Sequence, residues 1–477
     1  MLTTPKSRAA CLVAALLLTL AACGPNTQPS QTPGPGASAA GSMGPLGLVA
    51  AAGIQADLEA LEAIADASGG VRTAGTAGYE ASVDYVAGQL RDLGYAVQTP
   101  TFEMATFSEE PGATIAVAGG ATFASGPDFH AMIYSASGDL SARIAKVGYG
   151  DNESGGCSQS DFADFPRGAI ALAPPGQCFR RDAVVNAVNA GAVAFIVAYP
   201  QWSTGAVRRP TLIFPQGIEI PAISASGEVG EALRAAADAR KQVTVSVHTE
   251  IGSAVVRNVI AESHAVAEHV VMFGGHLDSV HDGPGINDNG SGSAALLGVA
   301  RVLAEQHPSV RVRFAFWAGE EFGLLGSRDY VATLRSAEQA EISAYLNFDM
   351  LGSPNYVPFV YDAPSAALGS KQIADFLVSY LEEAGIGAQA TDLGSSSDHA
   401  SFDGLGIPTG GIFTGATELK SATQAARFGG TADAPMDACY HLACDRVENV
   451  NVELVAELAQ AALALAVAIA SGQLQLN

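Results

Sequence analysis

The order of apolar and polar residues predicts helices and strands that alternate along much of the chain. Residues 54–70 and 78–95 carry apolar side chains at helical spacing, and glycines stand at the end of both runs. After residue 251, strand-like apolar runs alternate with helical patterns, with strands predicted at 255–262, 269–275, 310–319 and 344–350 and helices at 293–306 and 323–334. This alternation is typical of an α/β fold in which helices sandwich a mostly parallel, mixed sheet.

The pattern changes between residues 126 and 250, where short apolar runs, glycines and prolines surround one clear helical segment at 182–191. We therefore expect a small α+β domain, residues 126–250, inserted into a larger domain made of residues 46–125 and 251–477. The segment PRGAIALAPPGQCFRRDAVVNAVNAGAVAFIVAY resembles the protease-associated domain, in which a strand, a Gly and Cys turn, a helix and a buried strand follow one another. An unrelated α+β insertion is the alternative.

Residues 1–22 have the features of a bacterial export signal. Lys6 and Arg8 precede an apolar run, CLVAALLLTL, that is too short for an ordinary membrane helix. The string LAAC resembles a lipobox, which makes Cys23 the lipid-modified first residue of the mature chain; a plain signal peptide cut near Ala22 is the alternative. Residues 23–45 are mostly Pro, Gly, Ser and Ala and predict a flexible linker.

These features predict an exported lipoprotein of the bacterial cell envelope, periplasmic or on the outer surface, with release from the cell as a further option. The only membrane contact is then the lipid anchor at Cys23. The apolar run at 453–471 near the C-terminus contains Glu453, Glu457 and Gln460. It therefore predicts a core helix rather than a membrane span.

Cysteine usage fits an oxidising compartment. Without Cys11 in the signal segment and Cys23, four cysteines remain, and three pairings of them are formally possible. Proximity in the sequence favours two disulfides. The expected pairs are Cys157 with Cys178 and Cys439 with Cys444. A zinc site built from the four thiolates is the competing interpretation. It is less favoured because neither pair of cysteines has CxxC spacing.

The net charge of −24 becomes −26 without Lys6 and Arg8, since no acidic residue lies in the signal segment. So acidic a surface repels nucleic acid and anionic membranes, and nucleic acid is excluded as an expected partner. The hydrophobic fraction of 48% excludes a mostly disordered chain. We expect a folded monomer.

Three strands of the predicted sheet are followed by metal-capable side chains. His276 and Asp278 follow the first strand, Glu320 and Glu321 the second, and Asp349 the third. Ligands bind beyond the carboxyl ends of the strands in an open parallel sheet, so these side chains are expected to meet in one crevice. Carboxylates that meet raise one another's pKa values unless a cation is present. Nitrogen and oxygen ligands without thiolate favour catalytic zinc, and the number of carboxylates favours two ions about 3.5 to 4 Å apart.

Six motifs follow one another in the part of the chain after residue 251: GGHLDSVHDGPGINDNGSGSAALL, FAFWAGEEFGLLGSRDY, YLNFDMLGSPN, SDHASF, GIPTGGIFTGA and CYHLACD. In this order they resemble the motifs of the Streptomyces-type secreted double-zinc aminopeptidases. The resemblance covers residues 53–124 and 251–477 and implies a zinc-exopeptidase fold of the phosphorylase/hydrolase-like kind with two Zn²⁺ per chain. Members of this family with an inserted protease-associated domain account for residues 126–250.

The resemblance also implies the metal ligands, motif by motif. His276 and Asp349 are expected to bind one zinc, Glu321 and His441 the other, and Asp288 to bridge the two ions.

Four further residues receive roles. Glu320, the first glutamate of the GEE motif, is the implied general base, although chemistry alone does not decide between the adjacent glutamates. Tyr440 of the CYH motif is implied to donate a hydrogen bond to the oxyanion. Asp278 is expected behind His276 as an acceptor that orients the imidazole. Phe413 of the GIFTGA motif is expected to line the pocket for the first substrate residue and to favour apolar side chains.

Several other residues are expected to be bystanders. His281 and Asp282 lie in the glycine-rich loop as bystanders; no matched motif makes His281 a ligand, and we expect it at the surface. Asp57 and Asp84 are expected on solvated helix faces. Ser396 stands where the family frequently has an arginine.

The predicted function is therefore an exported metallo-aminopeptidase that acts on peptides with a free N-terminus. Three alternatives remain open. A carboxypeptidase or dipeptidase of the same superfamily requires a basic group for the substrate carboxylate, and the motif loops have few. A glutaminyl cyclase uses a similar fold with one zinc. A non-catalytic ectodomain usually lacks some of the metal ligands.

Overall fold

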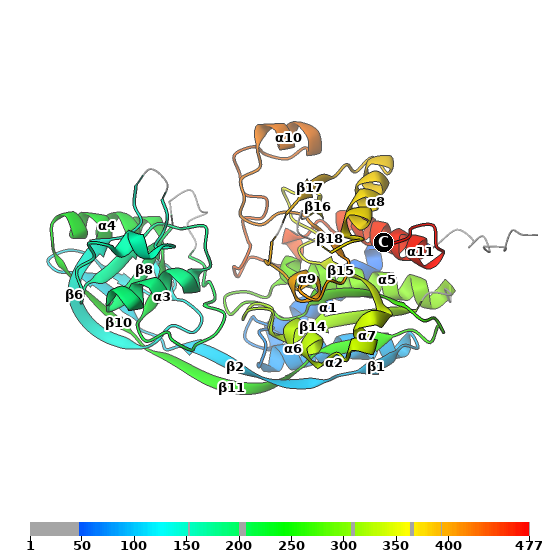
Figure 1. The fold of residues 1–477 in the computed structure, drawn as a ribbon, viewed down its shortest axis with the longest axis horizontal. Helices are drawn as coiled ribbons and strands as arrows, with labels where there is room; N and C mark the ends of the chain where they lie inside the picture. The colour runs from blue at the N-terminus through cyan, green and yellow to red at the C-terminus, as the bar shows by residue number, and fades with distance from the viewer. Residues whose placement is uncertain are drawn as a thin grey trace, which may run out of the picture. The chain divides into compact units, whose positions relative to one another are not determined.

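The computed structural model describes residues 47–150, 153–199, 207–306, 311–362, 367–392 and 394–476. The predicted signal segment, the lipid site at Cys23 and the linker lie outside these residues. In the described chain, the β-structure consists of two eight-stranded sheets and a two-stranded ribbon (Figure 1).

The four central strands of the first sheet are parallel. The sheet order is β1 (Ala96–Gln98), β12 (Val259–Glu262), β14 (Val312–Trp317), β13 (Val270–His276), β15 (Ile342–Phe348), β18 (Thr409–Phe413), β16 (Phe359–Tyr361) and β17 (Gln389–Thr391). Antiparallel pairs join β1, β12 and β14 on one side and β18 and β16 on the other. The predicted mixed, mostly parallel sheet is thus confirmed.

The central strand β13 is buried along its whole length, as its continuous apolar sequence predicts for a strand covered on both faces. Gly274 lies within this strand next to Tyr345 of β15. A Cβ atom at Gly274 would lie 2.2 Å from the hydroxyl of Tyr345, so only glycine fits beside this tyrosine.

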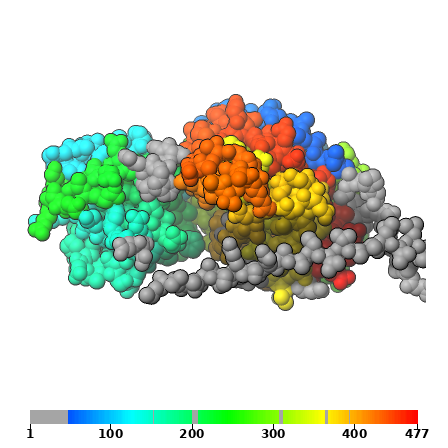
Figure 2. All heavy atoms as spheres, turned by 90° about the horizontal axis from the view of Figure 1, so that it is seen from above, coloured from blue at the N-terminus to red at the C-terminus, as the bar shows by residue number. Residues whose placement is uncertain are grey.

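Helices cover both faces of the sheet. One layer is built around α5 (Gly292–Gln306) and also contains α1 (Ala51–Ala67), α2 (Ala77–Asp92), α8 (Ser370–Glu383) and α11 (Val452–Ala470). The other contains α6 (Leu325–Thr333), α7 (Ser336–Glu341) and α9 (His399–Asp403), which contact β14 and β15. Figure 2 shows α10 (Ala422–Phe428) at the surface beside α8, and none of its residues is buried.

Helix α11 is long and apolar enough to cross a membrane by composition alone. In the fold it packs on α1, α5 and α8, and 67% of its apolar window is buried. It is therefore a core helix, as its polar interruptions predict.

The second sheet belongs to the middle of the chain. Its order is β4 (Thr122–Ala124), β3 (Thr114–Val117), β10 (Gln242–Val247), β6 (Gly138–Lys146), β7 (Ile170–Ala173), β8 (Ala194–Ala198), β9 (Ala222–Ala225) and β5 (Phe129–Ala131). Helices α3 (Arg180–Ala190) and α4 (Gly227–Asp238) pack on it. The predicted disulfide between Cys157 and Cys178 is formed, with its Cα atoms 5.6 Å apart. We call the part of the chain between Thr114 and Val247 the inserted lobe.

A long antiparallel ribbon connects the two parts of the chain. It consists of β2 (Thr101–Glu109) and β11 (Thr249–Arg257), with Thr101 opposite Arg257 and Glu109 opposite Thr249. The domain boundaries at 126 and 250 stay predictions. By strand pairing, the second sheet already begins at β3, because β3 pairs with β10.

Candidate metal centre

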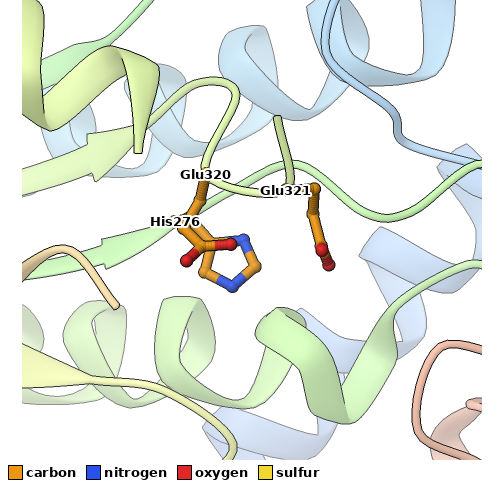
Figure 3. A group of neighbouring side chains, drawn as sticks. All are labelled: His276, Glu320 and Glu321. Atoms are coloured by element: carbon orange, nitrogen blue, oxygen red, sulfur yellow. The ribbon is translucent and has the colours of Figure 1, made fainter. Parts of the chain in front are cut away.

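The carboxyl ends of three adjacent parallel strands bring the predicted side chains together. His276 is the last residue of β13, Glu320 and Glu321 follow β14, and Asp349 follows β15. Because β13 lies between β14 and β15, the side chains enter the same region from three strands. Figure 3 shows the carboxylates of Glu320 and Glu321 on the loop after β14, beside the imidazole of His276.

A first group of possible ligands forms around His276. Its Nε2 atom lies 3.2 Å from Oδ1 of Asp288 and 3.6 Å from Oδ1 of Asp349. Its Nδ1 atom is 3.0 Å from the backbone carbonyl oxygen of Asp278, which can accept a hydrogen bond there. That bond leaves Nε2 as the ring nitrogen free to bind a cation.

A second group forms around His441 and shares Asp288 with the first. Nε2 of His441 lies 3.0 Å from Oδ2 of Asp288 and 3.2 Å from Oε2 of Glu321. Asp288 thus directs one carboxylate oxygen at each imidazole. The five predicted ligands are arranged as two triads that meet at Asp288.

The donor set fits a pair of zinc ions. In each triad the potential ligand atoms lie within 4.8 Å of one another, and the ligands are nitrogen and carboxylate oxygen without thiolate. Oε1 of Glu321 and Oδ1 of Asp349 are buried and accept no hydrogen bond from any described residue. Buried carboxylate oxygens without partners are costly, and a bound cation supplies the missing interaction.

The pKa values of the cluster also indicate an excess of buried negative charge. Burial and, to a smaller extent, the charge of Asp288 raise the pKa of Glu321 to about 7. Burial lowers the pKa of His441, but the adjacent Glu321 and Asp288 carboxylates outweigh it and raise the value to about 10. Without metal, protons must balance the buried negative charge. Cations would take over that role.

Asp278 supports both glutamates as well as His276. Its carboxylate accepts hydrogen bonds from the backbone N–H of Glu320 at 3.1 Å and of Glu321 at 3.4 Å. The carboxylate Oδ1 is 3.6 Å from Nδ1 of His276. Asp278 therefore lies behind His276. Its shortest contact to the ring is made by the carbonyl oxygen, and its carboxylate holds the loop that carries the glutamates.

Other residues that hold the ligands received no role from the sequence. The carboxylate of Asp445 accepts hydrogen bonds from the backbone N–H of Asn287 at 2.7 Å and of Asp288 at 3.0 Å. The hydroxyl of Ser397 donates to Oδ2 of Asp349 at 2.7 Å. Asp445 lies inside the motif CYHLACD and Ser397 inside the motif SDHASF. Membership of these motifs was the signal in the sequence that could have identified them as part of the site.

Arg72 is buried beneath the same loop and had no signal in the sequence. Its guanidinium donates to the carbonyl oxygens of Leu277, of Pro284 at 2.9 Å and of Gly285 at 2.5 Å. These bonds connect the two ends of the loop between His276 and Asp288.

The expectation that His281 is a surface residue was wrong, because His281, like its neighbour Asp282, is partly buried. The His281 ring packs edge-on against Phe322, with ring centres 5.6 Å apart, and burial lowers its pKa to about 4. The Asp282 carboxylate lies 3.2 Å from Nε of Arg209 in the inserted lobe. Neither belongs to the metal triads, so they are structural residues rather than solvated ones.

A cavity of about 150 Å³ opens beside the cluster. Its walls include Phe413, Tyr440 and Ser396, together with Asp288, Glu320, Asp349, Met350, Tyr361, Ser397, Ala416, Glu418 and His441. The Tyr440 ring stacks on the ring of His441 at 3.8 Å between centres. The predicted disulfide Cys439–Cys444 closes the loop that carries both rings, with Cα atoms 5.3 Å apart.

Comparison with known proteins agrees with this geometry. Residues 258–466 match the model of peptidase family M28, and residues 138–233 match the PA domain. An aminopeptidase of Pseudomonas aeruginosa is 39% identical over 426 residues, which cover 85% of this chain and 79% of the relative. A probable lipoprotein aminopeptidase, LpqL, of Mycobacterium tuberculosis is 41% identical over 421 residues, which cover 83% of this chain and 80% of the relative.

Among solved structures, the chain is similar to BSAP, a zinc aminopeptidase from Bacillus subtilis. That match has a TM-score of 0.66 at 26% identity and covers 86% of this chain and 94% of the other. The predicted fold, the inserted PA domain and the metallo-aminopeptidase class are thereby confirmed. The chain belongs to peptidase family M28, as an aminopeptidase member with a PA domain inserted between the two parts of its catalytic domain.

Proposed function

We propose that the protein is an exported aminopeptidase that holds two zinc ions and removes apolar residues from peptides with a free N-terminus. The observation that carries the two-ion reading is the position of Asp288. Its two carboxylate oxygens face the imidazoles of two separate triads. A carboxylate shared in this way is typical of two-metal hydrolases.

His276, Asp288 and Asp349 would hold one ion, and Asp288, Glu321 and His441 the other. When bound, zinc supplies Lewis acidity that polarises a carbonyl group and lowers the pKa of water toward about 7.

Glu320 is the proposed general base. It lines the cavity, and its backbone is fixed by the bond to Asp278. Burial raises its pKa well above the ordinary value, and the adjacent Glu321 adds to the effect while His276 opposes it. A carboxylate in such a site takes a proton from the attacking water and later returns it to the leaving amine.

Tyr440 is the proposed donor to the oxyanion. Burial and the surrounding carboxylates, beginning with Asp288, raise the pKa of its phenol well above the ordinary value. The phenol therefore keeps its proton at neutral pH. A neutral hydroxyl at the cavity wall can donate a hydrogen bond to the charge that develops on the carbonyl oxygen.

The cavity supports removal of a single terminal residue. Its volume of about 150 Å³ is below the range of roughly 300–1,000 Å³ that accommodates drug-sized ligands, and so fits one side chain better than an extended peptide. Met350, Phe413 and Ala416 give it apolar walls, which supports an apolar first residue. Carboxylates of the same cavity can attract the free α-ammonium group of the substrate.

The alternatives receive less support. Neither Lys nor Arg lines the cavity in the described structure, as a carboxypeptidase would need for its substrate carboxylate. The complete ligand set argues against a one-zinc cyclase and against a non-catalytic ectodomain. The proposed anchor at Cys23 and the envelope location are supported by the match to a probable lipoprotein relative. The monomeric state rests on the sequence alone.

A substrate panel tests the proposal. The purified protein is incubated with aminoacyl and N-blocked peptide substrates, with and without a chelator, and the products are identified by mass spectrometry. We expect stepwise loss of unblocked N-terminal residues, fastest for apolar ones, and loss of activity with the chelator. Cleavage of N-blocked peptides at internal bonds would contradict an aminopeptidase, and release of C-terminal residues would favour the carboxypeptidase alternative.

A further inference from the structure

The inserted lobe touches the loop that carries Tyr440. Nε of Arg208 donates a hydrogen bond to the backbone carbonyl oxygen of Tyr440 at 3.2 Å, although the residues are 232 positions apart. The guanidinium carbon lies 5.6 Å from the centre of the Tyr440 ring, within the range of a cation–π contact. One side chain of the inserted lobe therefore contacts both the backbone and the ring of a residue in the cavity wall.

The next residue fixes this segment to the loop between His276 and Asp288 and to the end of β2. Arg209 forms ion pairs with Asp282, in the loop between His276 and Asp288, and with Glu109 at the end of β2. Its guanidinium also donates to the carbonyl oxygen of Ala131 at 3.1 Å. Arg208 is thus presented to Tyr440 from a segment held at several points.

Among the described residues, Arg208 has no carboxylate partner that would explain its place otherwise. None of the ion pairs between described residues includes it, and its Nη2 atom is buried without a hydrogen-bond partner in that part of the chain. Burying a guanidinium away from an acid costs free energy, so the position calls for a specific contact. Its contacts with the Tyr440 carbonyl oxygen and ring meet that requirement.

We propose that Arg208 is a positioning residue through which the inserted lobe holds the Tyr440 hydroxyl in place for the reaction. The inference rests on the proposed function, in which Tyr440 donates to the oxyanion. Such a donor must lie about 2.7–3.1 Å from the oxygen in the transition state. Because the bond to the oxyanion forms only there, loss of positioning lowers kcat and leaves KM nearly unchanged.

A double-mutant cycle tests the coupling. The kcat and KM of Arg208→Ala, Arg208→Lys, Tyr440→Phe and the double variant Arg208→Ala/Tyr440→Phe are measured on an unblocked leucyl substrate, together with zinc content and Tm. We expect Arg208→Ala to lower kcat about tenfold, which is less than the loss of about 10²–10³ that removal of an oxyanion donor produces, because the hydroxyl is still present but less well placed. Arg208→Lys keeps a cation and a donor and should retain most of the activity.

The decisive comparison is made in the Tyr440→Phe background. There we expect Arg208→Ala to have no further effect on kcat, because the hydroxyl that it positions is absent. Arg181→Ala is the matched control, since Arg181 is an arginine of the inserted lobe that donates to the carbonyl oxygens of Phe214 and Gln216 and has no contact with Tyr440. It should keep the wild-type kcat.

Two results would overturn the inference and leave the proposed function intact. One is wild-type kcat in Arg208→Ala. The other is a loss of the same size in both backgrounds, which indicates a general structural role. If Arg208→Ala does not fold, Arg208→Gln, which keeps a hydrogen-bond donor but loses the cation over the ring, is measured in both backgrounds and should lower kcat only where the Tyr440 hydroxyl is present. A wild-type protein that is inactive on all unblocked peptides would instead remove the proposed function itself.

Discussion

Oδ2 of Asp288 lies 3.0 Å from Nε2 of His441. The other carboxylate oxygen of Asp288 faces His276 at 3.2 Å, so one side chain joins both triads. Asp445 accepts hydrogen bonds from the backbone at and before Asp288 and fixes this orientation. The arrangement makes Asp288 the residue on which both proposed metal sites depend.

Loss of Asp288 should therefore empty both sites. We expect about two zinc ions in the wild-type chain, near zero in Asp288→Ala and about one in Asp349→Asn. Elemental analysis of the purified proteins gives these contents. Asp282→Asn is the control, because Asp282 lies in the same loop outside the triads, and it should keep both ions. An Asp288→Ala protein that still holds two ions would contradict the shared-carboxylate reading.

The adjacent glutamates should behave differently. Glu320→Gln is expected to lower kcat by about 10²–10⁴ and to keep its zinc, since it loses only proton transfer. Glu321→Gln should lose zinc from the triad of His441, which it contacts at 3.2 Å. Steady-state kinetics together with metal content separates the two effects. Equal zinc loss in both variants would make Glu320 a ligand and remove it as the base.

The sequence revealed the parts of the site that depend on local pattern. Apolar runs that end near His276, Glu320 and Asp349 predict strands. Because the carboxyl ends of parallel strands lie at the same edge of a sheet, these side chains were expected to lie close together. Adjacent carboxylates are chemically alike, so the residues alone did not decide which of Glu320 and Glu321 is the general base and which is the metal ligand. Only the resemblance to a family assigned these two roles.

Contacts between distant segments were not predictable in this way. Asp57 was expected on a solvated helix face, but its carboxylate is buried and paired with Arg301 of α5, with contacts at 2.6 and 2.7 Å. Arg72 lies about two hundred positions before the carbonyl groups that it holds. Such partners are set by tertiary packing, which leaves no periodic signal in either segment.

Phe413 should set the preference for apolar first residues. Phe413→Ala removes an apolar wall of the cavity, and we expect kcat/KM for a leucyl substrate to fall about tenfold and for an alanyl substrate to fall less. Phe359→Ala is a matched control, because Phe359 stacks on Phe413 at 6.0 Å between ring centres but is not in the cavity wall. It should lower Tm with little change in the leucyl to alanyl ratio. A ratio unchanged in Phe413→Ala would place the specificity elsewhere.

Glu109 should contribute a stability that disappears in acid. Burial raises the pKa of this carboxyl, but hydrogen bonds and charges from His130, Arg209 and Ser125 outweigh burial and lower it from 4.5 to about 2. A group with a depressed folded pKa stabilises the protein above its unfolded pKa and loses this contribution as the pH falls through the folded value. The contribution is therefore complete above about pH 5 and lost toward pH 2.

The variant Glu109→Gln tests this pH dependence. We expect the wild-type protein to exceed Glu109→Gln by roughly 1–2 kcal/mol in free energy of unfolding at pH 7, after allowance for solvent screening. The difference should shrink at pH 3. Urea unfolding at both values measures it, and loss of zinc in acid affects both proteins alike. Glu103→Gln, an exposed glutamate of the same strand, should match the wild type at both values. A difference independent of pH would show that Glu109 acts through its shape and neutral hydrogen bonds rather than its charge.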